Sequence, residues 1–358
     1  MGLNMPDVNS SFWHGKRVLL TGHTGFKGSW LSLWLLSMGS VLRGISLDAP
    51  TTPSLFDIAR VADCMDHKVA DIRDYDAVRS LIAEFKPEII FHMAAQPLVR
   101  LSYEEPIATY ATNVMGTAHV LEAARHAGSV RSIVNVTTDK CYENREWIWG
   151  YREDEAMGGY DPYSSSKGCS ELVSSAYRKS FLQASGIGLA TARAGNVIGG
   201  GDWAVDRLVP DTLKALEQRR PVLIRNPHAV RPWQHVLEPL SGYLLLAESL
   251  FDHGPLNAEG WNFGPLDDDA RPVQWVVERL CKGWGGDASW ALQPGDHPHE
   301  AHYLKLDVSK ARQRLNWSPR LSLQAALALV NGWHQEWLSG SDMQAISLKQ
   351  ITEYRNQI

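Results

Sequence analysis

Tyr163 and Lys167 are the residues whose types and spacing first indicate chemistry. Side chains four residues apart lie on the same face of a helix. A free phenol has a pKa of about 10, so holding its anion at pH 7 costs about 4 kcal/mol. A cation about 4 Å away contributes about 4 kcal/mol of stabilisation at an effective dielectric constant of about 20, and an oxidised nicotinamide ring would add to it. The pair therefore predicts a tyrosine that takes a proton from a hydroxyl group, although the spacing alone also fits an amphipathic helix.

A second polar cluster is formed by Thr137, Thr138, Asp139 and Lys140, which follow the apolar segment 132–136. If that segment is a strand, these side chains emerge at its carboxyl end, where ligands bind in parallel sheets. Hydroxyl, acid and amine groups at this place are suited to catalysis. The alternative is a turn held by capping hydrogen bonds, which Tyr163 and Lys167 make less attractive.

The glycine-rich segment from Thr21 to Gly28 indicates a dinucleotide site. It follows the apolar segment 17–21 and opens a helical segment over 26–38. Glycines allow a tight turn and a close approach of the backbone to a pyrophosphate, which binds at the helix N-terminus. The alternative is a glycine-rich turn without a ligand. We assign Gly22, Thr24, Gly25, Phe26 and Gly28 to cofactor binding.

Asp48 favours NAD over NADP as the cofactor, because it lies 20 residues after Gly28, at the end of the segment 40–47. A carboxylate there accepts hydrogen bonds from the adenosine ribose and repels a 2′-phosphate. Arg43 complicates this prediction, since its guanidinium would bind that phosphate if it faced the cofactor. Further along, Asp71 and Ile72 are expected near the adenine, and Ala94, Ala95 and Gln96 beneath the ribose and nicotinamide.

Apolar segments that alternate with helical ones predict an α/β fold with a doubly wound parallel sheet, which is Rossmann-like, and a smaller mixed C-terminal substrate domain. Expected strands cover 17–21, 40–47, 67–70, 88–93, 132–136 and 188–193, and expected helices cover 26–38, 77–85, 105–127 and 161–180. We divide the chain into a dinucleotide-binding domain, 1–195 together with 232–262, and a nucleotide-sugar-binding domain, 196–231 and 263–358. The polar segment after Ser341 is expected to be peripheral.

Composition narrows the classes of partner. The chain of 358 residues has 44% hydrophobic and 21% charged residues and a formal net charge of −5. The sequence lacks a basic block of the kind that indicates nucleic acid as a partner, and no apolar run reaches the ~18 residues of a membrane span. A signal peptide is not recognisable, and the four cysteines, without paired metal spacing, are expected to be cytoplasmic thiols. The segment from His297 to Glu300 looks like a metal site, but without a third ligand group we expect no metal.

Taken together, these motifs resemble the extended short-chain dehydrogenase/reductase family. The resemblance covers residues 12–340 and rests on the glycine turn, Asn113 in its predicted helix, the Thr-Thr-Asp-Lys cluster and Tyr163 with Lys167. Asp139 resembles the acid of the nucleotide-sugar 4,6-dehydratases, which are lyases, and relatives acting on dTDP-glucose and GDP-mannose carry Glu at the position of Lys140. This departure, with the segments 92–100, 144–147 and 231–235, is similar to the dehydratases that act on CDP-glucose.

The resemblance implies roles for individual residues. Tyr163 removes the proton from O4 of the sugar while C4 is oxidised by NAD, and Thr138 binds O4. Asp139 protonates the departing O6, and Lys167 holds the nicotinamide ribose. Lys140 is our candidate for the base at C5, directly or through water. Asn113 joins the cofactor residues.

The expected substrate is CDP-D-glucose, converted to CDP-4-dehydro-6-deoxy-D-glucose. Gln96, Asn196, Arg207, Arg231 and Trp233 are the expected substrate-binding residues, because amide and guanidinium groups suit a diphosphate and an indole ring can stack on a base. Ion pairing and core packing remain alternatives for the arginines and the tryptophan. The resemblance also implies a homodimer, or a dimer of dimers, paired through the helices over 105–127 and 161–180, and a supply of 3,6-dideoxyhexoses for the O-antigen of lipopolysaccharide. A 4-epimerase, a dehydratase acting on dTDP-glucose or GDP-mannose, and a non-catalytic NAD(P)-binding regulatory protein are the competing interpretations.

Overall fold

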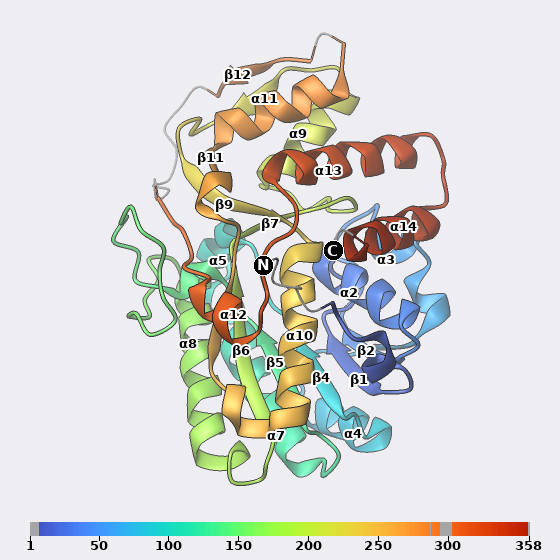
Figure 1. The fold of residues 1–358 in the computed structure, drawn as a ribbon, viewed down its shortest axis with the longest axis vertical. Coiled ribbons are helices and arrows are strands. Elements are labelled where there is room, and N and C mark those ends of the chain that lie inside the picture. Colours follow the sequence, from blue (N-terminus) through green and yellow to red (C-terminus); the bar gives the residue numbers. More distant parts are fainter. Residues whose placement is uncertain (1–6, 287, 294–302, 357–358) are drawn as a thin grey trace, which may run out of the picture.

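A central parallel sheet organises the protein, whose computed structural model describes residues 7–286, 288–293 and 303–356 (Figure 1). Within these residues the sheet has seven strands in the order β10-β6-β5-β4-β1-β2-β3. Its strands are β1 (Arg17–Thr21), β2 (Val41–Ser46), β3 (Asp66–Val69), β4 (Ile89–His92), β5 (Ser132–Val136), β6 (Gly188–Ala194) and β10 (Gly260–Phe263). The doubly wound parallel sheet predicted from the sequence is confirmed.

Helices cover both faces of this sheet. Successive residues of a strand point to opposite faces, and in β1 this places Val18 and Leu20 in one hydrophobic core and Leu19 in the other. The first core contains residues of α2 (Phe26–Ser37), α10 (Leu237–His253) and α14 (Met343–Arg355). The second contains residues of α4 (Tyr75–Phe85) and α7 (Gly116–His126), against which α8 (Pro162–Tyr177) packs.

A smaller part of the chain lies beyond the carboxyl edge of the sheet, at the top of Figure 1. It contains the sheets β11-β9-β7 and β12-β8. Its strands are β7 (Asn196–Ile198), β8 (Val222–Ile224), β9 (Val230–His235), β11 (Ala270–Pro272) and β12 (Trp290–Leu292), and its helices are α9 (Leu208–Glu217), α11 (Val273–Trp284) and α13 (Leu323–Leu338). The division into two domains stays our proposal, and the return of α10 and β10 to the central sheet supports its discontinuous boundaries.

The predicted helix over 105–127 is interrupted. It consists of α6 (Pro106–Tyr110), a π-helical segment (Ala111–Met115) and α7. The shorter elements are α1 (Ser10–Trp13), α3 (Leu55–Ile58), α5 (Val99–Glu104), α12 (Ser309–Arg314), a second π-helical segment (Arg178–Leu182) and 3-10 turns at Val61–Cys64, Asp139–Cys141, Gly254–Asn257 and Asp267–Asp269.

The expectation of a peripheral C-terminal segment is wrong. Helix α14 packs against α2, and Met343, Ile351 and Tyr354 are buried in the first core. The Tyr354 hydroxyl donates to a carboxylate oxygen of Glu238 in α10 (2.8 Å). A polar composition concealed this role because only one face of α14 is buried.

Candidate functional site

One large cavity of about 2370 Å³ opens at the carboxyl ends of the central strands. The strand order reverses between β1 and β4, which is the switch point where ligands bind in such sheets. A pocket for one drug-sized ligand measures about 300–1,000 Å³, so this cavity has room for a dinucleotide together with a second ligand. Every site residue predicted from the sequence lines it except Asn113.

The glycine turn allows backbone segments to approach each other closely in the cavity wall. Gly22 has a φ of +79°, and a Cβ atom there would lie 2.6 Å from the nitrogen of Ala94. A Cβ atom on Gly28 would lie 2.1 Å from the oxygen of Gly22. Gly25 caps α2 without a side-chain hydrogen bond, so the first amide groups of the helix are left for a ligand. This cradle fits the pyrophosphate of a dinucleotide.

The surroundings of Arg43 favour NAD. Its guanidinium donates to Asp66 (2.6 Å) and Glu84 (2.9 Å) and lies over the ring of Phe85, 4.8 Å from its centre. Arg43 is buried and does not line the cavity. Asp48 lines the cavity at the end of β2. The complication raised by Arg43 is therefore removed, because its side chain is directed toward α4.

Asn113 lies behind the cavity wall. Its amide donates to the backbone oxygen of Gln96 (3.0 Å) and to the Ser166 hydroxyl (2.9 Å), and its oxygen accepts from the Gln96 nitrogen (2.8 Å). The π-helical segment turns this side chain inward, and such segments are frequent at functional sites. We therefore infer that Asn113 positions the backbone beneath the cofactor rather than contacting it.

The remaining predicted cofactor residues are held by neighbouring groups. Thr24 donates to the oxygen of Leu47 (3.0 Å), which fixes the glycine turn to the end of β2. Asp71 accepts from Arg73 (2.6 Å), and this pairing lowers the pKa of Asp71. Ile72 is buried close to Gly116 of α7. Their roles toward a cofactor remain our proposal.

Tyr163 and Lys167 face the cavity from the first two turns of α8. Asp161 caps this helix by accepting from the Ser164 nitrogen (2.9 Å), and Pro162 occupies its first position. Burial raises the pKa of Tyr163 to about 12, and a hydrogen bond with Thr138 opposes the increase. The Lys167 ammonium donates to the backbone oxygen of Val136 (3.2 Å), and burial lowers its pKa to about 8. The lowered tyrosine pKa expected from the sequence is thus not produced by Lys167 alone.

The carboxyl group of Asp139 is buried away from solvent. The residue is 2% exposed, and burial raises the pKa of its carboxyl group, against the effects of Lys140 and of a hydrogen bond from Thr138. One carboxyl oxygen accepts from the Thr138 hydroxyl (3.0 Å), whereas Oδ2 is buried without a partner among the described residues. A Cβ atom on Gly195 would lie 2.9 Å from that oxygen. Glycine at this position therefore keeps space beside the acid.

The predicted substrate residues all line the cavity. The Arg207 guanidinium donates to Asp202 (3.0 Å), and Arg231 donates to the oxygen of Val230 (3.0 Å). Asn196 begins β7. Trp233 is 4% exposed and packs in a hydrophobic core, so most of its ring serves packing. The Gln96 amide donates to Leu98 and Thr109 within the protein.

Lys27 is a cavity residue that the sequence analysis missed. It is the second residue of α2 and lines the cavity. Burial, together with the positive charges of Arg207 and Lys167, lowers its pKa to about 8, while Asp139 and Asp202 oppose this effect. The available signal was a charged residue at the end of the glycine turn, between Phe26 and Gly28.

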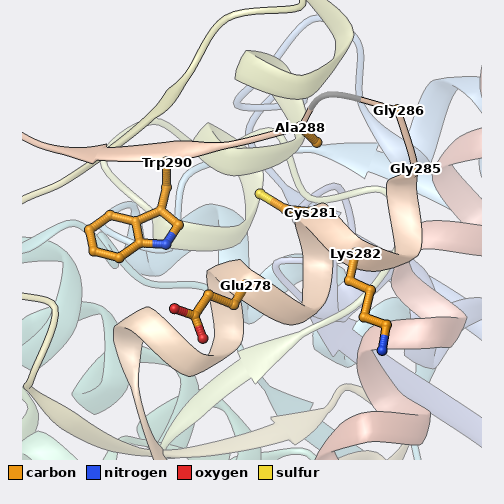
Figure 2. Close-up of a pocket in the computed structure, with 7 residues that line it drawn as sticks. All are labelled: Glu278, Cys281, Lys282, Gly285, Gly286, Ala288 and Trp290. Atoms are coloured by element: carbon orange, nitrogen blue, oxygen red, sulfur yellow. The ribbon is translucent and has the colours of Figure 1, made fainter.

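A second, smaller cavity lies at the end of α11, and Figure 2 shows its lining residues. It measures about 370 Å³, and Trp290 and Cys281 belong to its wall.

Among the described residues, no group of three His, Cys, Asp or Glu side chains is placed to hold a metal. The segment from His297 to Glu300 lies outside the described residues. In the part of the chain that the structure covers, the helices lack the length and apolar character that crossing a bilayer requires.

The fold and site define an extended short-chain dehydrogenase/reductase. A family model described as GDP-mannose 4,6 dehydratase matches residues 19–259, and the chain belongs to this family. It is 59% identical over 352 residues to a CDP-glucose 4,6-dehydratase from Salmonella typhimurium (strain LT2), covering 97% of this chain and 98% of the relative.

Solved structures share the same fold. A UDP-glucose 4-epimerase from Thermotoga maritima, solved with UDP-glucose, has a TM-score of 0.79 at 22% identity, covering 90% of this chain and 99% of that one. A dTDP-glucose 4,6-dehydratase from Streptomyces venezuelae, solved with NAD, has a TM-score of 0.77 at 23% identity, covering 92% of this chain and 99% of that one.

Proposed function

We propose that this protein is a lyase that converts CDP-D-glucose to CDP-4-dehydro-6-deoxy-D-glucose with NAD as its cofactor. The observation that carries the proposal is Asp139, an acid with a raised pKa and a buried, unpartnered oxygen in the same cavity as Tyr163. Loss of the C6 hydroxyl requires an acid there, whereas epimerisation at C4 does not. The 59% identity to a CDP-glucose 4,6-dehydratase supports the choice of nucleotide.

The reaction begins at O4 of the sugar. Thr138 binds this hydroxyl and Tyr163 takes its proton. Tyr163 must be ionised to act as this base, and because its pKa is about 12 in the protein alone, ionisation near neutral pH requires that pKa to fall when the ligands bind. When bound, NAD would supply the redox chemistry: a hydride acceptor for C4 and a hydride donor for C6. Because Lys167 donates to the backbone of Val136, its ammonium is held ready to bind the ribose of the cofactor.

Elimination of water follows at C5 and C6. The ketone at C4 acidifies the hydrogen on C5, and we assign its removal to Lys140, which lines the cavity beside Asp139. Asp139 is the acid for O6, since its raised pKa lets it hold a proton nearer to neutral pH than an ordinary carboxyl group. We assign the diphosphate of the substrate to Arg207, Arg231 and Asn196, which line the same cavity.

Assembly as a homodimer belongs to the same proposal. Three apolar side chains here are exposed: Ile107 of α6 (80%), Met115 of the first π-helical segment (53%) and Leu172 of α8 (61%). These apolar side chains lie on the two helical segments expected to pair, and burying them against a second copy would be favourable. We also infer a cytoplasmic location, where nucleotide sugars and reduced thiols occur together.

The proposal is tested by incubating the purified protein and NAD with CDP-glucose, dTDP-glucose or GDP-mannose in parallel. We expect a product with the alkali-induced absorbance of a 4-keto sugar from CDP-glucose alone. A C4 epimer without that absorbance would identify an epimerase instead. Product from dTDP-glucose but not from CDP-glucose would reject the nucleotide, and no reaction with any of the three would reject the enzyme class.

A further inference from the structure

Lys27 has surroundings that a structural lysine would not have. It lies in the first turn of α2, a 12-residue helix whose N-terminal end carries partial positive charge. A cation is unfavourable at that end, and the first turn contains no acidic residue to offset it. Within the described residues, its ammonium forms no hydrogen bond or ion pair. An unfavourable and unpartnered charge that faces a cavity indicates a ligand.

The charges around Lys27 come from both halves of the cavity. Lys167 belongs to the side assigned to the cofactor, and Arg207, at the start of α9, belongs to the side assigned to the substrate. Asp202 is already bonded to Arg207 (3.0 Å), and one oxygen of Asp139 is bonded to Thr138 (3.0 Å). These two acids therefore leave a positive excess around Lys27, which favours the binding of anions.

We propose that Lys27 binds phosphate oxygens where the two halves of the cavity meet, so that one ammonium serves the diphosphate of the cofactor and that of the nucleotide sugar. This inference rests on the proposed function, which places two diphosphates in one cavity. The glycine turn adjoining Lys27 holds the first diphosphate, and Arg207 holds the second. The cavity of about 2370 Å³ accommodates both ligands.

The test measures binding without turnover. Calorimetric titrations of wild-type protein and Lys27→Met with NAD alone, and with CDP, dTDP or GDP alone, give a Kd for each ligand. Loss of one charged hydrogen bond weakens binding by about tenfold or more, so we expect Lys27→Met to raise the Kd of NAD and of the bound nucleotide by about this factor. Lys27→Arg, which keeps the charge, should stay within about threefold of wild type.

A second readout separates binding from a structural defect. The pKa of Lys27 is about 8, so an anion that contacts it should raise this pKa and cause proton uptake at about pH 8.5. Titrations in buffers of different ionisation enthalpy should show this uptake in wild-type protein, but not in Lys27→Met or Lys27→Arg. Lys349→Met removes a lysine that is 69% exposed on α14 and should change neither Kd nor proton uptake.

The outcomes are distinct. If Lys27→Met weakens the binding of only one ligand, Lys27 serves one half of the cavity and the shared role is overturned. If the Kd values of NAD and of the nucleotide are both unchanged, Lys27 binds neither ligand. If wild-type protein binds dTDP or GDP instead of CDP, the nucleotide in the proposed function is wrong, while the test of Lys27 proceeds with that nucleotide. Wild-type protein that binds NAD but none of the three nucleotides would overturn both proposals.

Discussion

Asp139 and Lys140 are adjacent residues with different surroundings. Asp139 is 2% exposed and has a raised pKa, whereas Lys140 is half-buried, and both line the cavity. This difference fits our proposal that Asp139 is the acid for O6 and Lys140 the base at C5.

Replacement of Lys140 by Gln tests the base at C5. When the wild-type reaction runs in deuterated water, the C5 hydrogen of the product should come from solvent. Because Lys140→Gln lacks a base there, we expect turnover to fall by about 10²–10⁴-fold. Oxidation at C4 should persist and be visible as reduced cofactor, and mass spectrometry measures the deuterium at C5. Lys214→Gln, a change elsewhere in the cavity wall, serves as the control. Full exchange at C5 in Lys140→Gln would assign the base to another residue.

The direction of individual side chains was the least predictable feature of the site. Types and spacing were sufficient to bring Tyr163, Lys167 and Asp139 to one cavity. They did not show that Arg43 points to α4, because its partners Asp66 and Glu84 come from distant parts of the sequence. The position of Lys27 in the cavity was missed for a similar reason, since Asp202 and Arg207 are brought near it only by the fold.

Helix α8 is fixed to the central sheet by a buried ion pair. Glu171, one turn after Lys167, accepts two hydrogen bonds from Arg193 of β6, each 2.8 Å long. Thr137 and Thr191 donate to the same carboxylate. Residues four apart share a helix face, so this anchor also holds Lys167 toward the cavity.

Removal of Glu171 should therefore weaken the whole helix. Glu171→Ala leaves Arg193 charged and buried without its partner, which costs about 3–5 kcal/mol of unfolding free energy. Urea denaturation monitored by circular dichroism measures the loss. Lys179→Ala, an exposed change just beyond α8, should alter stability by less than about 0.5 kcal/mol. A loss below about 1 kcal/mol in Glu171→Ala would mean that Arg193 finds another partner or water.

Strands and helices could be predicted where the run of apolar residues is long or its side chains are strongly buried. The strands expected over 17–21 and 132–136 coincide with β1 and β5. The pattern did not reveal the interruption around Asn113, because a π-helical segment keeps the composition of an α-helix. It also gave no clear signal for β10, whose four residues include a glycine and a buried asparagine.

At the scale of the whole molecule, Glu238 joins parts of the chain that are distant in sequence. This residue of α10 accepts from the nitrogens of Leu321 (2.6 Å) and Arg320 (2.9 Å) and from the Tyr354 hydroxyl (2.8 Å). It is 1% exposed, and burial raises its pKa from 4.5 to about 7. Ionisation of Glu238 is therefore harder in the folded protein than in the unfolded chain.

This difference predicts how stability changes with pH. Below pH 4.5 the group is protonated in both states, and its unfavourable contribution grows as pH rises toward 7. A shift of this size corresponds to about 3 kcal/mol. Glu238→Gln mimics the protonated form, so its stability relative to wild type should improve by up to about 3 kcal/mol between about pH 5 and pH 8. Denaturation at each pH measures this, with Glu353→Gln, exposed on α14, as the control. A constant difference across that range would contradict the assignment.

Strand β10 pairs with β6 on the side of β6 that lies away from β5. Residues 188–194 of β6 are synthesised well before residues 260–263, and α10 lies between them in the chain. While the ribosome is still translating the intervening segment, one side of β6 offers unpaired backbone groups, which are a template for pairing with another chain. The nascent protein therefore has a period of exposure that ends only when residue 263 has left the exit tunnel. Slow translation of residues 195–263 would lengthen that period, and a chaperone that shields β6 would protect the yield of folded protein.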